Sequence, residues 1–157
     1  MLSLGSEYTK YMEMALEEAK KAYELKEIPV GAVLVAEDGG VLSKAHNLKE
    51  TLKDCTAHAE LLALRQAALL IGGWRLNGYT LFVTKEPCIM CSGAILNFRV
   101  SRLIYGCYDK KGGGVESLYK LLNDPRLNHR VEVMGGVLEI ECGRLLTEFF
   151  KNKRYYQ

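Results

Sequence analysis

Two short motifs constrain the fold most, T-A-H-A-E at residues 56–60 and T-K-E-P-C-I-M-C at residues 84–91. Proline suits the first position of a helix, so Pro87 predicts a helix that opens at Cys88. Cys88 and Cys91 are three residues apart and then share one helical face, where both sulfurs can reach one ion. The positive end of a helix dipole also favours thiolate over thiol. The second motif therefore predicts a metal site.

His58 is the best placed third ligand, because two thiolates leave a tetrahedral zinc site incomplete and His58 lies at the start of a predicted helix over residues 57–71. Four protein ligands close a structural site, whereas three leave a position for a water molecule whose pKa the ion lowers to about 7. Glu60 follows His58 by two residues, about 200° around a helix, so we expect it to stand beside this water without binding the ion.

Weaker interpretations of each motif alone remain open. A Cys-x-x-Cys can be a redox pair or half of a structural zinc clamp, and a single histidine is usually a core or surface residue. Joined, H-x-E and P-C-x-x-C form the signature of zinc nucleobase deaminases. Cys55 precedes His58 by three residues and could close the site as a fourth ligand. We expect instead that Cys55, like Cys107 and Cys142, is a small buried thiol, the commoner state of a free cysteine.

Length and composition indicate one ordinary globular domain over residues 1–157, since the chain is 48% hydrophobic and 25% charged and can bury a full core. A net charge of +2 is low for a dedicated nucleic-acid binder, so any RNA contact must depend on local patches. We expect no signal peptide and no membrane span. Five unevenly spaced cysteines do not indicate a disulfide framework, and a cytoplasmic protein is the expectation.

Hydrophobic periodicity predicts alternating helices and strands. We expect a helix over 6–26, a hairpin of strands 31–37 and 41–46, a loop over 47–56, the helix over 57–71, a strand over 79–84, a helix over 88–98, a strand over 102–107, a helix over 116–122, a strand over 131–134 and a helix over 137–155. The strand, helix and strand between 79 and 107 form a unit typical of parallel sheets. The metal site then lies at the carboxyl end of a strand, where open α/β sheets bind ligands. We expect His46 to end a strand and His129 to form a hydrogen bond in a loop.

Further motifs resemble those of a known family. P-V-G-A-V-L-V, A-H-N, T-A-H-A-E, E-P-C-I-M-C, N-H-R-V and F-F-K-N-K-R occur in the order and roughly the spacing found in bacterial tRNA-specific adenosine deaminases, of the cytidine-deaminase-like superfamily. The resemblance covers nearly the whole chain. It implies an α/β protein with a three-layer α/β/α fold, in which a mixed five-stranded sheet has helices on both faces. It also implies hydrolytic conversion of the wobble adenosine of a tRNA anticodon to inosine, with release of ammonia.

The same resemblance assigns roles to the motif residues. It implies one zinc ion per subunit, bound by His58, Cys88 and Cys91, with a zinc-bound water as nucleophile and Glu60 as the proton shuttle. Because Glu60 is not a ligand, one carboxylate can take the proton of water and later give protons to the ring nitrogen and the leaving amine.

Substrate contacts are also implied by the resemblance. Asn47 is expected to contact the target base, and Pro29 and Val30 to line its pocket. Residues expected near the RNA are Asp109, Lys111, Asn128, Lys151 and Arg154. The family is homodimeric, and its tRNA site is formed across both subunits. The expected partners are therefore the anticodon arm of a tRNA and a second copy of the chain, without a membrane.

Three positions depart from the family pattern: Lys85 replaces the usual leucine, Cys55 a proline, and Glu116 a small residue. Glu116 is tolerable as the first residue of a predicted helix. Lys85, at the end of a buried strand, must bring its charge to water or a carboxylate. Two other functions stay open. One is deamination of a free base, nucleoside or nucleotide of the guanine, cytosine or cytidine type, and the other is a non-catalytic zinc-stabilised module with a fourth protein ligand.

Overall fold

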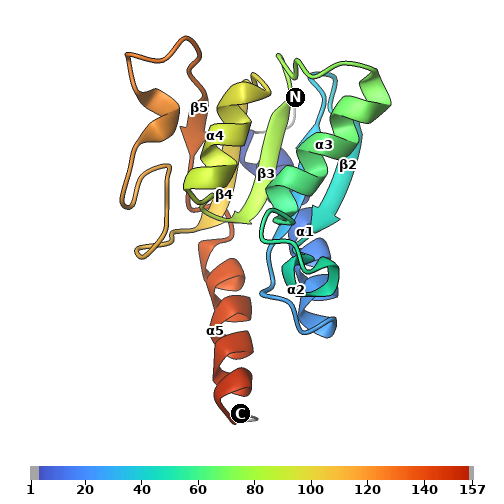
Figure 1. The fold of residues 1–157 in the computed structure, drawn as a ribbon, viewed down its shortest axis with the longest axis vertical. Coiled ribbons are helices and arrows are strands. Elements are labelled where there is room, and N and C mark those ends of the chain that lie inside the picture. Colours follow the sequence, from blue (N-terminus) through green and yellow to red (C-terminus); the bar gives the residue numbers. More distant parts are fainter. Residues whose placement is uncertain (1–3, 156–157) are drawn as a thin grey trace.

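The computed structural model describes residues 4–155, which form one sheet with helices on both faces (Figure 1). Its elements are α1 (Leu4–Glu24), β1 (Gly31–Val35), β2 (Val41–His46), α2 (Lys49–Leu52), α3 (Ala59–Ile71), β3 (Thr80–Lys85), α4 (Ile89–Asn97), β4 (Arg102–Cys107), the 3₁₀ turn η1 (Leu121–Asn123), β5 (Glu132–Met134) and α5 (Glu139–Tyr155). No helix in this described part of the chain has the length and hydropathy of a membrane span.

The sheet is mixed, with the strand order β2-β1-β3-β4-β5. β1 runs antiparallel to both β2 and β3, while β4 runs parallel to β3 and to β5. The hairpin of β1 and β2 and the parallel unit of β3, α4 and β4 are both as the sequence predicts. The carboxyl ends of β3 and β4 therefore lie at the same edge of the sheet.

Two hydrophobic cores lie on opposite faces of this sheet. Side chains alternate between faces along a strand, so in β3 Phe82 packs toward α1 and α5, while Leu81 and Val83 pack toward α3 and α4. Met12 and Cys142 belong to the first core, and the second also contains the helix residues Ala63, Leu64, Ala67 and Ile95. The predicted three-layer arrangement is confirmed.

Both motif helices begin just after a predicted metal ligand. His58 and Cys88 are the N-cap residues of α3 and α4 and have extended backbones, with ψ of 150° and 178°. The prediction that Cys88 lies on the helical face is therefore wrong by one residue, because Pro87 and Cys88 precede the first turn and only Cys91 lies within it. Gly72 ends α3 in the left-handed conformation, with φ of 73°, as predicted.

Two local predictions fail. Residues 116–122 do not form the predicted α-helix, and the one helical element near them is the 3₁₀ turn η1. The reason is that the amides at 115–117 bond to the carboxylate of Glu86. The predicted loop over 47–56 contains the short helix α2, in which the amides of Glu50 and Thr51 bond to Glu27. In both places a carboxylate distant in sequence sets the local conformation. The other predicted elements are present with ends within two residues.

Candidate metal centre and active site

The side chains of His58, Cys88 and Cys91 meet at the amino ends of α3 and α4. Nδ1 of His58 lies 3.7 Å from Sγ of Cys88 and 3.5 Å from Sγ of Cys91. A tetrahedral zinc ion with Zn–S of about 2.3 Å and Zn–N of about 2.0 Å requires sulfur and nitrogen ligands about 3.5 Å apart. The donor set and its spacing thus fit one zinc ion.

Within residues 4–155, these three form the one group of at least three His, Cys, Asp or Glu side chains close enough to bind a single metal ion. Three is the ligand number of a catalytic zinc site. Cys55 does not join them and is exposed, so the prediction that it is a buried thiol is wrong. The same prediction is confirmed for Cys107 and Cys142.

The electrostatics of the cysteine pair favour a cation. A hydrogen bond from Cys91, together with the His58 ring, lowers the pKa of Cys88 to about 4 although burial opposes this shift. The hydrogen bond with Cys88, together with burial, raises the pKa of Cys91. Cys88 is therefore a thiolate at neutral pH, and the thiolate is the form of cysteine that binds metal.

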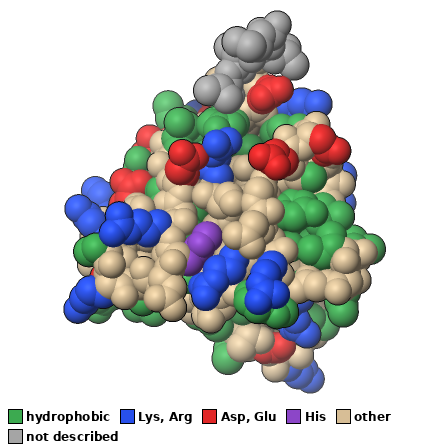
Figure 2. Space-filling view, turned by 90° about the horizontal axis from the view of Figure 1, so that it is seen from above, with side chains coloured by type: hydrophobic (Ala, Val, Ile, Leu, Met, Phe, Trp, Pro, Cys, Tyr) green, Lys and Arg blue, Asp and Glu red, His purple; other side chains and the backbone are tan. Residues whose placement is uncertain are grey.

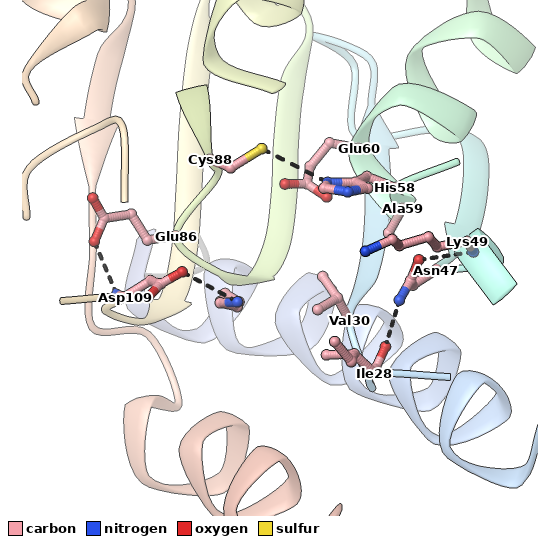
Figure 3. A pocket seen from close by; sticks show the side chains of 11 residues that line it. Ile28, Val30, Asn47, Lys49, His58, Ala59, Glu60, Glu86, Cys88 and Asp109 are labelled. Carbon is pink, nitrogen blue, oxygen red and sulfur yellow. Dashed lines mark hydrogen bonds and ion pairs between the residues drawn. The ribbon is translucent and has the colours of Figure 1, made fainter. Parts of the chain in front are cut away.

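Glu60 stands in the first turn of α3 and is 4% exposed. Figure 3 shows its carboxylate beside His58, across from Cys88, with the pocket open to it. Burial raises the pKa of Glu60. A carboxylate with a raised pKa accepts and releases a proton at neutral pH more readily than an exposed one, which suits it to acid and base catalysis.

A pocket of about 160 Å³ opens in front of these residues. It is small compared with the roughly 300–1,000 Å³ of sites for drug-sized ligands. Its lining residues are Ile28, Val30, Asn47, Lys49, His58, Ala59, Glu60, Lys85, Glu86, Cys88 and Asp109 (Figure 3). The pocket therefore suits a single small ring system placed against the metal ligands and Glu60.

Asn47 lies just after β2 on the wall opposite Cys88 (Figure 3). Its Nδ2 donates to the carbonyl of Ile28 at 3.1 Å, and its Oδ1 accepts the amide of Lys49 at 3.1 Å. An amide side chain has two donor hydrogens and two acceptor lone pairs, so one of each is left for a ligand. Val30 lines the pocket as expected, whereas Pro29 is buried and does not.

A groove of about 980 Å³ adjoins the pocket. Its lining residues are Lys85, Asp109, Lys111, Gly112, Leu146, Thr147, Phe150 and Lys151. The structure thus gathers three residues expected near RNA, Asp109, Lys111 and Lys151. Asn128 is exposed in the loop before β5 and lines neither cavity. Arg154 belongs to α5, but its side chain is outside those that the structure describes.

Other residues of the pocket were not predicted from the sequence. Ile28, Lys49 and Glu86 carry no signal of their own, although Glu86 belongs to the E-P-C motif. Lys85 departs from the family pattern, and its ammonium pairs with Asp109 at 3.2 Å. The expectation that its charge reaches water or a carboxylate is confirmed.

The remaining histidines behave as predicted. His46 ends β2, and Nε2 of His129 lies 2.7 Å from the carbonyl oxygen of Val100. Glu116 is exposed and opens no helix, so its expected helical role is wrong.

A buried glutamate lies beside three zinc-binding side chains, at the carboxyl ends of the parallel strands in a three-layer α/β/α fold. This combination of fold and site defines a zinc-dependent nucleobase deaminase. Residues 6–107 match the family described as the cytidine and deoxycytidylate deaminase zinc-binding region.

Individual relatives narrow this class. The tRNA-specific adenosine deaminase of Bacillus subtilis (strain 168) is 49% identical over 144 residues, 92% of this chain and 89% of the relative. That of Aquifex aeolicus (strain VF5) is 49% identical over 151 residues, 96% and 97% of the two chains. A solved structure from a study of A-to-I editing by tRNA:A34 deaminases superposes with a TM-score of 0.84 at 45% identity, covering 88% of this chain and 99% of the other. The chain belongs to the tRNA-specific adenosine deaminase family, as the motifs predict.

Proposed function

We propose that this enzyme hydrolyses the exocyclic amine of the wobble adenosine in a tRNA anticodon loop, giving inosine and ammonia. The observation that carries the proposal is the buried Glu60 carboxylate beside three zinc-binding side chains in a pocket of about 160 Å³. The names of the relatives support tRNA as the substrate, and the solved tRNA:A34 deaminase supports the wobble position.

The residues of the pocket divide the chemistry between them. Zinc bound by His58, Cys88 and Cys91 supplies a Lewis acid that makes water a nucleophile at neutral pH. Glu60 takes a proton as the oxygen of water bonds to the ring carbon that bears the amine. Glu60 passes this proton to the ring nitrogen, takes the second proton from the added hydroxyl oxygen and gives it to the amine, so that the carbon–nitrogen bond breaks, the oxygen becomes the carbonyl of inosine and ammonia leaves. Burial suits Glu60 to hold the proton between the two transfers, since it raises the pKa of this carboxyl.

The target base must leave its stack to reach Glu60, so an unpaired loop is the fitting substrate. Asn47 offers one N–H and one oxygen lone pair toward the pocket, and its own hydrogen bonds to Ile28 and Lys49 hold the amide still. Val30 provides an apolar wall for the ring. We assign recognition of the base to Asn47 and its packing to Val30.

The anticodon arm has a positively charged groove available beside the pocket. Lys85, Lys111 and Lys151 line this groove with a single carboxylate, Asp109, and Phe150 adds a stacking face. Figure 2 shows the end of the molecule opposite the tip of α5, where Lys and Arg are interspersed with Asp and Glu. We assign the RNA to the groove because its three lysines outnumber its single carboxylate.

A homodimer is the second partner that we propose. Neighbouring helices on one face of the sheet expose large apolar side chains at two places: Ile89 and Met90 where α4 begins beside the metal ligands, and Leu69, Leu70 and Trp74 at and just after the far end of α3. Exposed apolar side chains on one face favour a protein interface there. We place the dimer contact on this face.

The cysteines and the proposed substrate support one cellular compartment. All five cysteines are free, which is typical of proteins in a reducing compartment. We therefore place the enzyme in the cytoplasm, where tRNA is available.

One assay tests the proposed function. The purified enzyme is incubated with an anticodon stem-loop that carries a wobble adenosine and, separately, with free adenosine, guanine and cytidine. Inosine in the stem-loop, without turnover of the three small molecules, is the expected result. Release of ammonia from free guanine or cytidine, with an unchanged stem-loop, would identify a small-molecule deaminase of the same fold instead.

A further inference from the structure

Lys85 lies where the pocket and the groove meet. It is the last residue of β3, and its side chain is 30% exposed. Lys85 and Asp109 are the two residues that line both the pocket in front of Glu60 and the groove along α5. A nucleotide that places its base in the pocket and its neighbour in the groove therefore passes its backbone by this pair.

The position of the Lys85 ammonium is fixed by Asp109. Nζ lies 3.2 Å from Oδ2 of Asp109, while Oδ1 of the same carboxylate accepts the amides of Lys111 and Gly112, each at 3.1 Å. Asp109 is anchored in turn by its own amide, which donates to Glu86 at 3.1 Å. An ammonium has three N–H donors, and Asp109 is its one partner among the described residues. Donors are left over for a ligand.

The charges around this pair favour an anionic ligand. Alone, the Asp109 carboxylate would repel a phosphate, and the Lys85 ammonium neutralises it. Lys111 and Lys151 then leave the groove with an excess of positive charge. Holding an ammonium partly out of water has a desolvation cost that a leucine at this place would avoid, so the charge itself indicates a role.

We propose that Lys85 binds the phosphate that joins the adenosine in the pocket to the neighbouring nucleotide in the groove. This inference rests on the proposed function, because it takes RNA as the ligand. A lysine that contacts a phosphate strengthens binding without reading sequence. Lys85 contacts no reacting atom, so its contact stabilises bound substrate and transition state equally and lowers KM without raising kcat.

The test measures the salt dependence of binding. Affinity for a fluorescent anticodon stem-loop is measured at several salt concentrations for the wild type and for Lys85→Met. One phosphate contact in single-stranded RNA contributes about 0.7 to the slope of log K against log salt, so Lys85→Met should reduce the slope by about that amount. The KM for the stem-loop should rise severalfold while kcat stays the same. Lys85→Arg should keep the wild-type slope.

A double variant separates a phosphate contact from simple neutralisation of Asp109. Lys85→Met combined with Asp109→Asn removes both charges of the pair. If Lys85 binds phosphate, the double variant keeps the reduced slope. If Lys85 serves only as the counterion of Asp109, the double variant regains the wild-type slope, and the inference is overturned.

A matched control is Lys10→Met, which removes the same charge at an exposed position of α1. Lys10 lies beside Tyr11, which packs near the opposite end of β3. This variant should keep the wild-type slope and KM. Should Lys85→Met fail to show a cooperative thermal transition, Lys85→Gln removes the charge with a polar side chain and takes its place.

The two proposals fail in different ways. If the wild type forms no inosine in the stem-loop, the proposed function is overturned, and the role of Lys85 falls with it. If the wild type forms inosine but Lys85→Met keeps its slope and KM, only the role of Lys85 is overturned.

Discussion

The carboxylate of Glu86 accepts the backbone N–H of Ser117 at 2.9 Å across a separation of 31 residues. The same oxygen accepts the amides of Val115 and Glu116 at 3.2 and 2.8 Å, and the other accepts the amide of Asp109 at 3.1 Å and the hydroxyl of Ser117. Glu86 is 2% exposed. Its hydrogen bonds therefore tie the segment before the metal ligands to the loop that carries the groove residues.

Replacing Glu86 with glutamine should destabilise the fold and weaken RNA binding. Hydrogen bonds to a charged acceptor contribute about 1.5–3 kcal/mol each when buried. In the variant, the side-chain NH₂ group of glutamine would also face backbone N–H groups, so that donor would meet donor. We expect the free energy of unfolding to fall by at least about 2 kcal/mol. Urea denaturation measures this loss.

The exposed Glu13 on α1 provides the control, since Glu13→Gln removes the same charge without a buried partner. Equal stabilities of the two variants would contradict the role of Glu86.

Glu27 gives a prediction that depends on pH. It is fully buried, and its two oxygens accept the amides of Glu50 and Thr51 at 2.9 and 2.7 Å, at the start of the helix that brings Lys49 to the pocket. Burial raises the pKa of Glu27, but these hydrogen bonds outweigh it and the pKa lies below its ordinary value of 4.5. Stability from a carboxylate with a lowered pKa is full above pH 4.5 and is lost as the pH falls through the folded-state value.

The variant Glu27→Gln should therefore be less stable than the wild type at pH 7, and the difference should shrink as the pH falls below 4.5. Urea denaturation of both proteins from pH 7 downward measures it. Comparing the two removes the contributions of Glu18 and Glu86, whose pKa values are also lowered. A difference that stays constant with pH would contradict this role of Glu27.

Those parts of the site that depend on residues close together in the sequence could be predicted, and those that depend on residues far apart in the sequence could not. The meeting of His58, Cys88 and Cys91 could be expected because each motif is local and each ligand stands at the start of a helix on the same sheet edge. The pocket residues from the A-H-N and P-V-G motifs could be placed through the family resemblance.

Long-range polar contacts could not be predicted from local patterns. Glu27 bonds to Thr51 across 24 residues, and Lys85 pairs with Asp109 across the sheet edge. The helix predicted over 116–122 is absent for the same reason. The backbone amides of Glu116 and Ser117 donate to the Glu86 carboxylate, and the local residue pattern gives no sign of this contact. Hydrophobic periodicity reports which face is buried and contains no information about which carboxylate binds a distant amide.

Replacing Glu60 with glutamine should abolish turnover while zinc stays bound. Positioned acid and base groups contribute about 10²–10⁴-fold to rates, so kcat on the stem-loop should fall by at least about 10³-fold when one group serves both transfers. Glu60 is not among the three clustered donors, so elemental analysis should find one zinc ion per chain in wild type and variant. Activity close to that of the wild type would exclude Glu60 as the proton shuttle.

Replacing Cys91 with alanine should remove the metal. Two donors remain, and zinc sites need three or four protein ligands, so the zinc content should fall from one per chain to nearly zero. The midpoint of thermal unfolding should also become insensitive to a chelator that lowers it in the wild type. Cys142→Ala is the control, because Cys142 is buried and free but lies outside the metal cluster. Zinc retained by the Cys91 variant would contradict the assigned ligand set.

Leu69 tests the dimer face, since its side chain is 85% exposed at the end of α3. Replacing Leu69 with glutamate places a charge in the proposed apolar contact, where an unpaired carboxylate is costly to bury, while the isolated subunit loses no core packing. We expect light scattering to show a monomer with nearly unchanged thermal stability. Since the family resemblance implies a tRNA site formed across both subunits, we also expect the KM for the stem-loop to rise. Leu25→Glu is the matched control, at a side chain 51% exposed just after α1, which packs on the other face of the sheet. A dimer that persists in the Leu69 variant but dissociates in the Leu25 variant would move the interface to the face covered by α1.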